Sequence, residues 1–191
     1  MRKSKQETAK TRQRIVTSAA AEFRRHGING IGLTGLMAAS GLTHGGFYRH
    51  FDSKEKLVEE ACSAAVESIA GKMASAISAK SKQSCLKTAA AQYLSKEHRD
   101  NPSEGCPLAA LGSEIARSDE STRSAMTEGF LKLVDTIAGQ LGESRPTVAK
   151  QRALVAVSTM IGALTVSRIV TDPELSAAIL RHTQAHLSHA G

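Results

Sequence analysis

Apolar residues recur at intervals of three or four along most of the chain, the spacing that places them on one side of an α-helix. Ile15, Ala19 and Phe23 form one such stripe, and Gly27 follows it as a natural helix end. No segment sustains the alternation of apolar and polar residues that a half-buried strand requires. The pattern therefore predicts an all-α protein.

The breaks between the stripes predict about nine helices. Thr34, Thr43 and Ser53 are placed to cap three of them, because a short side-chain oxygen accepts an unpaired backbone N–H. Pro107 and Pro173 mark the starts of two others, since proline is tolerated in a helix's first turn. The expected helices cover residues 8–26, 34–41, 44–51, 53–79, 83–100, 107–117, 120–142, 147–171 and 173–188.

The fourth expected helix is long enough to connect two parts of the molecule. Some 25 residues of helix extend roughly 37 Å at about 1.5 Å per residue. We therefore expect residues 1–52 to form one domain and residues 53–191 to form a helical body.

The net charge of +7 is confined to the start of the chain. Residues 1–50 hold nine Lys and Arg against two acids, whereas the rest holds 16 of each sign. A localised positive field attracts a polyanion. Charge alone leaves three possibilities open, which are nucleic acid, an anionic membrane surface and a solvated basic tail.

Residues 33–57 have the layout of a helix-turn-helix. Two short capped helices are separated by a turn that contains Gly41. The second helix, residues 44–51, would enter a DNA major groove with its N-terminal end toward the bases. Gly45 and Gly46 at that end would let the backbone approach DNA closely, although a tight bend is the alternative reason for the pair.

The run Gly-Leu-Thr-His-Gly-Gly-Phe-Tyr-Arg-His-Phe at residues 41–51, followed by Ser53-Lys54-Glu55 and Leu57, resembles the N-terminal signature of TetR/AcrR-family transcriptional regulators. The stripe of the first helix also matches that family. The resemblance covers about residues 10–60. It implies a helix-turn-helix domain followed by a ligand-binding and dimerisation domain.

The resemblance also implies which residues contact DNA. Thr34, Tyr48, His50 and Lys54 fall at positions that contact the phosphate backbone, and hydroxyl, imidazole and ammonium groups suit that role. His44 could contact a base edge or a phosphate. The candidate DNA-binding residues are Thr34, Thr43, His44, Gly45, Gly46, Phe47, Tyr48, His50 and Lys54. Phe47 could instead belong to the core, as we expect of Phe51, and Arg12 and Arg14 could add electrostatic contacts or simply be solvated.

Residues 153–169 are apolar or small nearly all the way round, so this helix must be buried on more than one side. The last helix carries Leu175, Ile179, His182 and His186 on one stripe. Proteins of the resembled family dimerise through their last two helices, and a dimer would read a palindromic operator. A monomer with a body thick enough to bury residues 153–169 is the alternative.

Three cysteines at irregular spacing do not make a disulfide framework or a zinc ribbon. Pro107 places Cys106 at a helix N-terminus, where the helix dipole lowers a thiol pKa. Some TetR-like regulators that sense electrophiles or oxidants have a cysteine in a similar setting, so Cys106 could be a sensor, or simply a small buried residue. The candidate ligand-binding residues are Tyr93, Cys106, Leu111, Ile115, Met126, Phe130 and Met160, each of which could be plain core.

No nucleophile–base–orienter set, phosphate-binding loop or cofactor motif is visible, so an enzyme with a Cys106 nucleophile remains only an alternative. His182, His186 and His189 have a spacing that can bind a metal, but no acid or cysteine supports them, and we assign no metal or cofactor. No signal peptide is apparent and the uncharged run 153–167 is short for a bilayer. These observations predict a cytoplasmic dimeric repressor, released from operator DNA by a small-molecule or electrophile effector.

Overall fold

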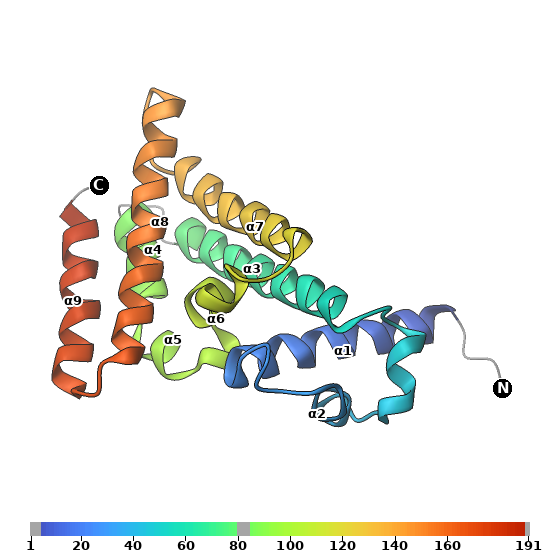
Figure 1. The fold of residues 1–191 in the computed structure, drawn as a ribbon. Coiled ribbons are helices and arrows are strands. Elements are labelled where there is room, and N and C mark those ends of the chain that lie inside the picture. Colours follow the sequence, from blue (N-terminus) through green and yellow to red (C-terminus); the bar gives the residue numbers. More distant parts are fainter. Residues whose placement is uncertain (1–4, 80–84, 190–191) are drawn as a thin grey trace.

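The computed structural model describes residues 5–79 and 85–189, which form nine α-helices, two 3-10 helices and no strand (Figure 1). The all-α prediction is confirmed. The helices in chain order are α1 Lys5–His26, α2 Leu33–Ala39, the 3-10 helix η1 His44–Arg49, α3 Lys54–Ala79, α4 Cys85–Tyr93, α5 Lys96–Asp100, the 3-10 helix η2 Pro102–Glu104, α6 Pro107–Ile115, α7 Glu120–Ala138, α8 Pro146–Ile169 and α9 Pro173–His189.

Two helices of the body differ from the boundaries that the sequence pattern predicts. The single helix expected over residues 83–100 is wrong, because α4 ends at Tyr93 and Ser95 caps α5 by accepting a 3.1 Å hydrogen bond from the His98 N–H. Residue 83, its expected start, lies outside the described residues. Helix α7 ends at Ala138, four residues before the expected end, because Gly139 and Gln140 turn the chain away.

The predicted caps are correct in one case of three. The Ser53 hydroxyl accepts a hydrogen bond from the Lys56 N–H, as a cap of α3 should. Thr34 lies inside α2, whose N-cap is Gly32, so its predicted capping role is wrong. Thr43 occupies the N-cap of η1, but its side chain makes no capping hydrogen bond.

α1, α2 and η1 pack together at one end of the molecule around buried phenylalanines (Figure 1). Phe23 and Phe47 are fully buried, and the Phe47 ring stacks on Phe51 with their centroids 5.8 Å apart. Gly27 after α1 and Gly41 after α2 have φ values of +84° and +67°, which other residues rarely adopt. These two glycines set the directions in which the chain leaves α1 and α2.

α3 runs from this end into the body, where α7 packs along it (Figure 1). Gly129 of α7 lies against α3 so closely that a Cβ there would be 2.8 Å from Cγ1 of Val66. Real Cβ atoms do not approach other atoms that closely, so this helix pair requires the glycine. The two helices therefore form a tightly packed core for the body.

α8 and α9 lie side by side at the opposite end of the molecule (Figure 1). On α8, 62% of Val155 and 70% of Ile169 are exposed, and Leu175 on α9 is also exposed. One side of this pair is therefore apolar and uncovered in the single chain. This agrees with the expectation that the helix must be buried on more than one side.

Among the described residues, α8 alone is long and apolar enough to cross a membrane by length and composition. About a third of the relevant 18-residue window is buried inside the chain. One such helix is weak evidence for a membrane span, because the core helix of a soluble protein passes the same test of length and composition.

Candidate DNA-binding face and effector cavity

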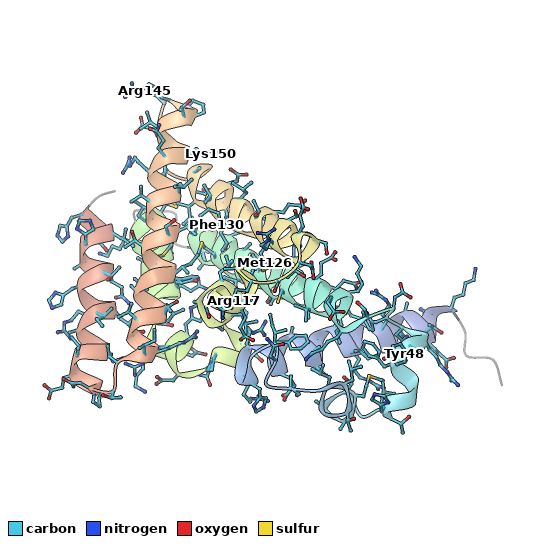
Figure 2. The ribbon with its side chains drawn as sticks, in the orientation of Figure 1. Tyr48, Arg117, Met126, Phe130, Arg145 and Lys150 are labelled. Carbon is cyan, nitrogen blue, oxygen red and sulfur yellow. The ribbon has the colours of Figure 1, made fainter. Side chains whose placement is uncertain are left out.

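The turn and η1 present a row of polar groups to solvent. Thr43, His44, Gly45 and Tyr48 are exposed, with 65% of Tyr48 accessible (Figure 2). His50 and Gly46 are half-buried at the edge of this row, and Thr34 is exposed on neighbouring α2.

Phe47 is a correction to the predicted DNA-binding set. Its side chain is fully buried and meets the Tyr48 ring edge-on, with the centroids 5.1 Å apart. A buried side chain cannot reach a base, so Phe47 packs behind η1 and supports it.

The type of helix at residues 44–51 is a second correction. These residues were expected to form an α-helix, but residues 44–49 form a 3-10 helix. Gly45 and Gly46 lie in it, and glycine has a low propensity for the α-helix.

Lys54 lies next to this face, with its ammonium engaged within the protein. Its Nζ donates to the carbonyl oxygens of Ile28 and Ile31, at 2.6 and 2.7 Å. This arrangement fixes the connection between α1 and α2 to the start of α3. A phosphate contact by Lys54 would use its remaining donor capacity or replace one of these bonds.

Arg12 is also occupied within the protein. Its guanidinium pairs with Glu60 at 2.5 Å, donates to the His50 carbonyl oxygen at 3.3 Å and lies over the Phe51 ring at 4.4 Å. This bonding raises the pKa of Arg12, mainly through the hydrogen bond to Glu60. Arg12 therefore positions η1 against α1 and α3, and Glu60 offsets part of its charge.

Two further contacts join α1 and the connection after it to the body. The Arg24 guanidinium on α1 donates to the carbonyl oxygen of Ser103 in η2, with Nε at 2.9 Å. The Glu114 carboxylate on α6 accepts hydrogen bonds from the N–H groups of Ile28 and Asn29, at 2.9 and 3.2 Å. Sequence analysis missed both contacts, since neither residue stands out in a motif.

The body contains a cavity of about 190 Å³ between α3, α4 and the segment from Ser95 to Glu104. Of the candidate ligand-binding residues, only Tyr93 lines it. Phe130 is half-buried, and the others are buried in the core and do not line this cavity, namely Cys106, Leu111, Ile115, Met126 and Met160. The lining residues that sequence analysis did not single out as ligand-binding are Ile69, Lys72, Met73, Gln92, Ser95, Glu97, His98, Asn101 and Glu104.

Cys106 is the N-cap of α6, as the position of Pro107 predicted. The prediction that the helix terminus lowers the pKa of its thiol is wrong. Its side chain is fully buried, and burial raises the pKa of the thiol above its ordinary value. Loss of hydration therefore outweighs the helix terminus and the neighbouring Tyr93 and Arg168. The Cys106 backbone N–H donates to Nε2 of His98 at 2.9 Å, so this residue is built into the α5–α6 connection.

His98 is held in one protonation state by its surroundings. Its Nδ1 lies 2.6 Å from the carbonyl oxygen of Tyr93 and therefore donates, while Nε2 accepts from Cys106. Burial lowers the pKa of His98 to about 4. The imidazole is therefore neutral at physiological pH.

A family model for bacterial regulatory proteins of the tetR family matches residues 15–61. A second, for the C-terminal domain of LmrA/YxaF-like transcriptional regulators, matches residues 78–182. The HTH-type transcriptional regulator LmrA of Bacillus subtilis (strain 168) is 28% identical over 160 residues, which is 81% of each chain.

Two further proteins are similar to the chain. The probable acrEF/envCD operon repressor of Escherichia coli (strain K12) is 36% identical over 59 residues, 31% of this chain, and the match spans only 27% of that relative. The crystal structure of a TetR transcriptional regulator from Chloroflexus aurantiacus J-10-FL superimposes with a TM-score of 0.76 at 30% identity, covering 96% of this chain and 95% of the other. Since the second family model alone covers more than half of the sequence, the chain belongs to the TetR family of bacterial transcriptional regulators.

Proposed function

We propose that this protein is a cytoplasmic repressor that binds a palindromic operator as a homodimer and releases it when a small molecule binds in the body. TetR-family regulators bind operator DNA as dimers, and some bind small-molecule effectors. The observation that carries the proposal is the exposed polar row on η1, backed by the buried Phe47. No catalytic role is proposed for any residue.

Residues 1–52 are the DNA-reading part in this proposal, and residues 53–191 bind the effector and dimerise. Thr34, Tyr48, His50 and Lys54 contact phosphates, while His44 and the backbone at Gly45 and Gly46 approach the bases. Hydroxyl and ammonium donors position a protein on the duplex, and base-edge contacts supply specificity. Phe47 is omitted because it is buried.

The dimer forms through α8 and α9. The apolar side chains exposed on these helices, Leu154, Val155, Val166, Ile169 and Leu175, suit burial against a second copy. Two copies of η1 related by a two-fold axis would read two half-sites of one operator.

A cysteine sensor is the weaker alternative for effector recognition. A reactive cysteine needs an accessible thiol with a lowered pKa, whereas Cys106 is fully buried and its pKa is raised. The structure gives the same reason against a Cys106 nucleophile.

The test is binding of the full-length protein to a DNA fragment from upstream of its own gene, followed by footprinting. Tyr48→Phe removes only the hydroxyl and is expected to weaken binding about fivefold per reading helix, the equivalent of one hydrogen bond of ~1 kcal/mol. Ser124→Ala on α7, an exposed site away from this face, is the matched control. Protection without two-fold symmetry, or equal binding by Tyr48→Phe and Ser124→Ala, would refute the assignment of this face.

A further inference from the structure

The outward side of α9 carries two histidines that have no partner within the chain. His182 and His186 are exposed, and neither makes a hydrogen bond or an ion pair in the part of the chain that the structure describes. His189 differs from them, because its Nδ1 lies 2.7 Å from the carbonyl oxygen of Ala185 in its own helix. Two imidazoles are therefore free to bind a group that a single chain does not supply.

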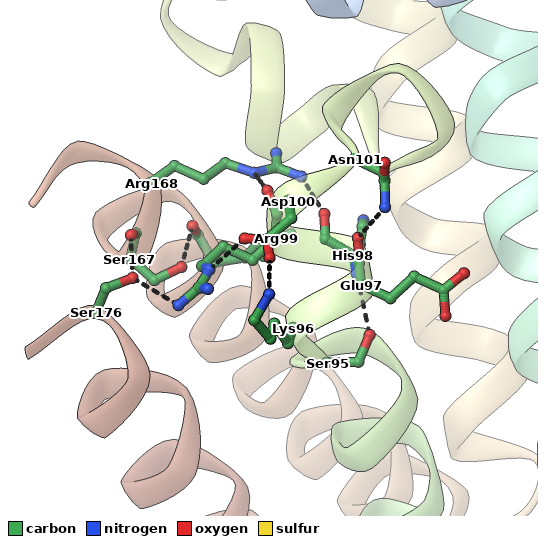
Figure 3. A network of polar contacts seen from close by, with 11 residues as sticks. Ser95, Lys96, Glu97, His98, Arg99, Asp100, Asn101, Ser167, Arg168 and Ser176 are labelled. Atoms are coloured by element: carbon green, nitrogen blue, oxygen red, sulfur yellow. Dashed lines mark hydrogen bonds and ion pairs between the residues drawn. The ribbon is translucent and has the colours of Figure 1, made fainter. Parts of the chain in front are cut away.

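Hydrogen bonds at two points along α9 fix which side of the helix faces outward. At its start, the Ser176 hydroxyl donates to the Ser167 carbonyl oxygen at 2.6 Å and accepts from Arg99 at 3.0 Å (Figure 3). Further along, Nε2 of Gln184 donates to the Leu94 carbonyl oxygen at 2.8 Å. Successive residues of an α-helix turn by about 100°, so the two histidines, which lie two positions before and two positions after Gln184, face away from the body.

The two histidines belong to the side of α9 that the proposed dimer buries. They share one stripe with Leu175 and Ile179, at helical spacing, and this stripe holds no Lys, Arg, Asp or Glu. Leu175 belongs to the apolar, uncovered side of the α8–α9 pair. When a second copy covers this side, His182 and His186 lose their contact with water, and buried polar groups in proteins need partners.

A pair of histidines four residues apart on one helical face has the spacing that binds a transition-metal ion. Imidazole nitrogen is a good ligand for Zn²⁺, Cu²⁺ and Ni²⁺, and a structural zinc site takes four ligands in a tetrahedron. One chain supplies only this pair. Among the described residues, no group of three or more His, Cys, Asp or Glu side chains could hold a metal ion. The site is therefore incomplete in a single chain.

We propose that His182 and His186 of two protomers together bind one divalent transition-metal ion of the Zn²⁺ class on the two-fold axis of the dimer. In an interface between identical copies, residues beside the two-fold axis meet their own counterparts, so two ligands from each copy make four. An ion held in this way binds the dimer and not the monomer, and it therefore stabilises the dimer. This inference rests on the dimer of the proposed function.

The test uses tag-free, full-length protein that has been stripped of metal with EDTA and then freed of EDTA, with Zn²⁺ alone as the probe. Isothermal titration calorimetry is expected to give one Zn²⁺ per two chains. In sedimentation equilibrium, Zn²⁺ at about ten times its dissociation constant should lower the dimer dissociation constant about tenfold. Co²⁺ in place of Zn²⁺ should give the visible absorption of a tetrahedral site.

Two variants and a matched control locate the ligands. His182→Gln and His186→Gln each remove one ligand from each copy, so each should lose the response of the dimer dissociation constant to Zn²⁺. His189→Gln makes the same substitution in the next turn, at a side chain that is bonded within its own helix, and should respond as wild type does. Each variant is compared with itself in the presence and absence of Zn²⁺, so any effect of the substitution on the metal-free dimer cancels.

The proposal is overturned if one Zn²⁺ binds per chain, which would indicate a chelate within a single copy, or if Zn²⁺ leaves the dimer dissociation constant unchanged. It is also overturned if the variants at both proposed ligands respond as wild type does. A metal-free protein that is dimeric and protects a two-fold symmetric operator would leave the repressor assignment intact after such a failure. A protein that stays monomeric with and without Zn²⁺ would refute both the metal site and the proposed dimer.

Discussion

Glu114 is the residue whose removal should most directly loosen the DNA-binding end from the body. Its carboxylate on α6 accepts two backbone N–H groups, from Ile28 at 2.9 Å and Asn29 at 3.2 Å. It also lies so close to Gly27 that a Cβ there would be 2.8 Å from Oε1. Glu114→Ala would remove the side-chain acceptor that both N–H groups share.

The size of the effect follows from the exposure of the two donors. A hydrogen bond to a charged group contributes about 1.5–3 kcal/mol when it is shielded from water. The Ile28 bond is partly buried, whereas the Asn29 bond is exposed and water can replace it. We therefore expect Glu114→Ala to lower the free energy of unfolding by about 2 kcal/mol. Glu114→Gln keeps an acceptor and should cost about half as much.

Urea denaturation measures the loss of stability, and amide hydrogen exchange at Ile28 and Asn29 locates it. Exchange at these two amides should accelerate in Glu114→Ala, whereas amides in the centre of α7 should change only as much as global stability does. A loss below 0.5 kcal/mol (roughly the size of a neutral surface substitution) with unchanged exchange would refute the reasoning.

Three further predictions follow from packing and burial. Gly129→Ala should lower the free energy of unfolding by about 1–3 kcal/mol, because the added Cβ would clash with Val66. In a double-mutant cycle, adding Val66→Ala should restore part of this loss, whereas additive losses would contradict a direct clash. The pKa of His98 is lowered from 6.5 to about 4 in the folded state, so the unfolded chain takes up a proton on His98 at a higher pH than the folded chain does. The free energy of unfolding should therefore fall by up to about 3 kcal/mol as the pH drops from 7 to 4. His98→Gln should flatten this pH profile in urea titrations, and a profile parallel to wild type would show that other groups control it. Tyr93→Phe should change the Tm little, because the buried hydroxyl faces the Cys106 thiol, which is only a weak hydrogen-bond acceptor, and a clear drop in Tm would contradict this.

The sequence predicted those features that depend on local pattern. The helical course of α3 through Ala79 and the position of Cys106 before α6 follow from apolar spacing and from proline chemistry. The recognition motif is local too, so the exposed residues of η1 could be named in advance. Each of these rests on neighbours within a few positions of the chain.

Features that depend on distant neighbours were missed. The cavity combines Ile69, Gln92 and Glu104, which no short motif connects. The pKa of Cys106 was expected to be lowered by the helix terminus, but burial by the rest of the fold raises it. Phe47 lies within the motif, and the sequence left open whether it contacts DNA or belongs to the core; its complete burial places it in the core.

The hydrogen bonds that hold the segment from Ser95 to Glu104 affect which sequence changes this segment can tolerate during evolution. Arg24 and Arg168 donate to main-chain carbonyl oxygens in it, those of Ser103, Arg99 and His98. Main-chain acceptors persist whatever side chains the segment carries. In the proposed repressor, mutations along it would therefore alter what the cavity accepts while the two arginines keep its connections to α1 and α8, so recognition of a new inducer would evolve separately from the response to it.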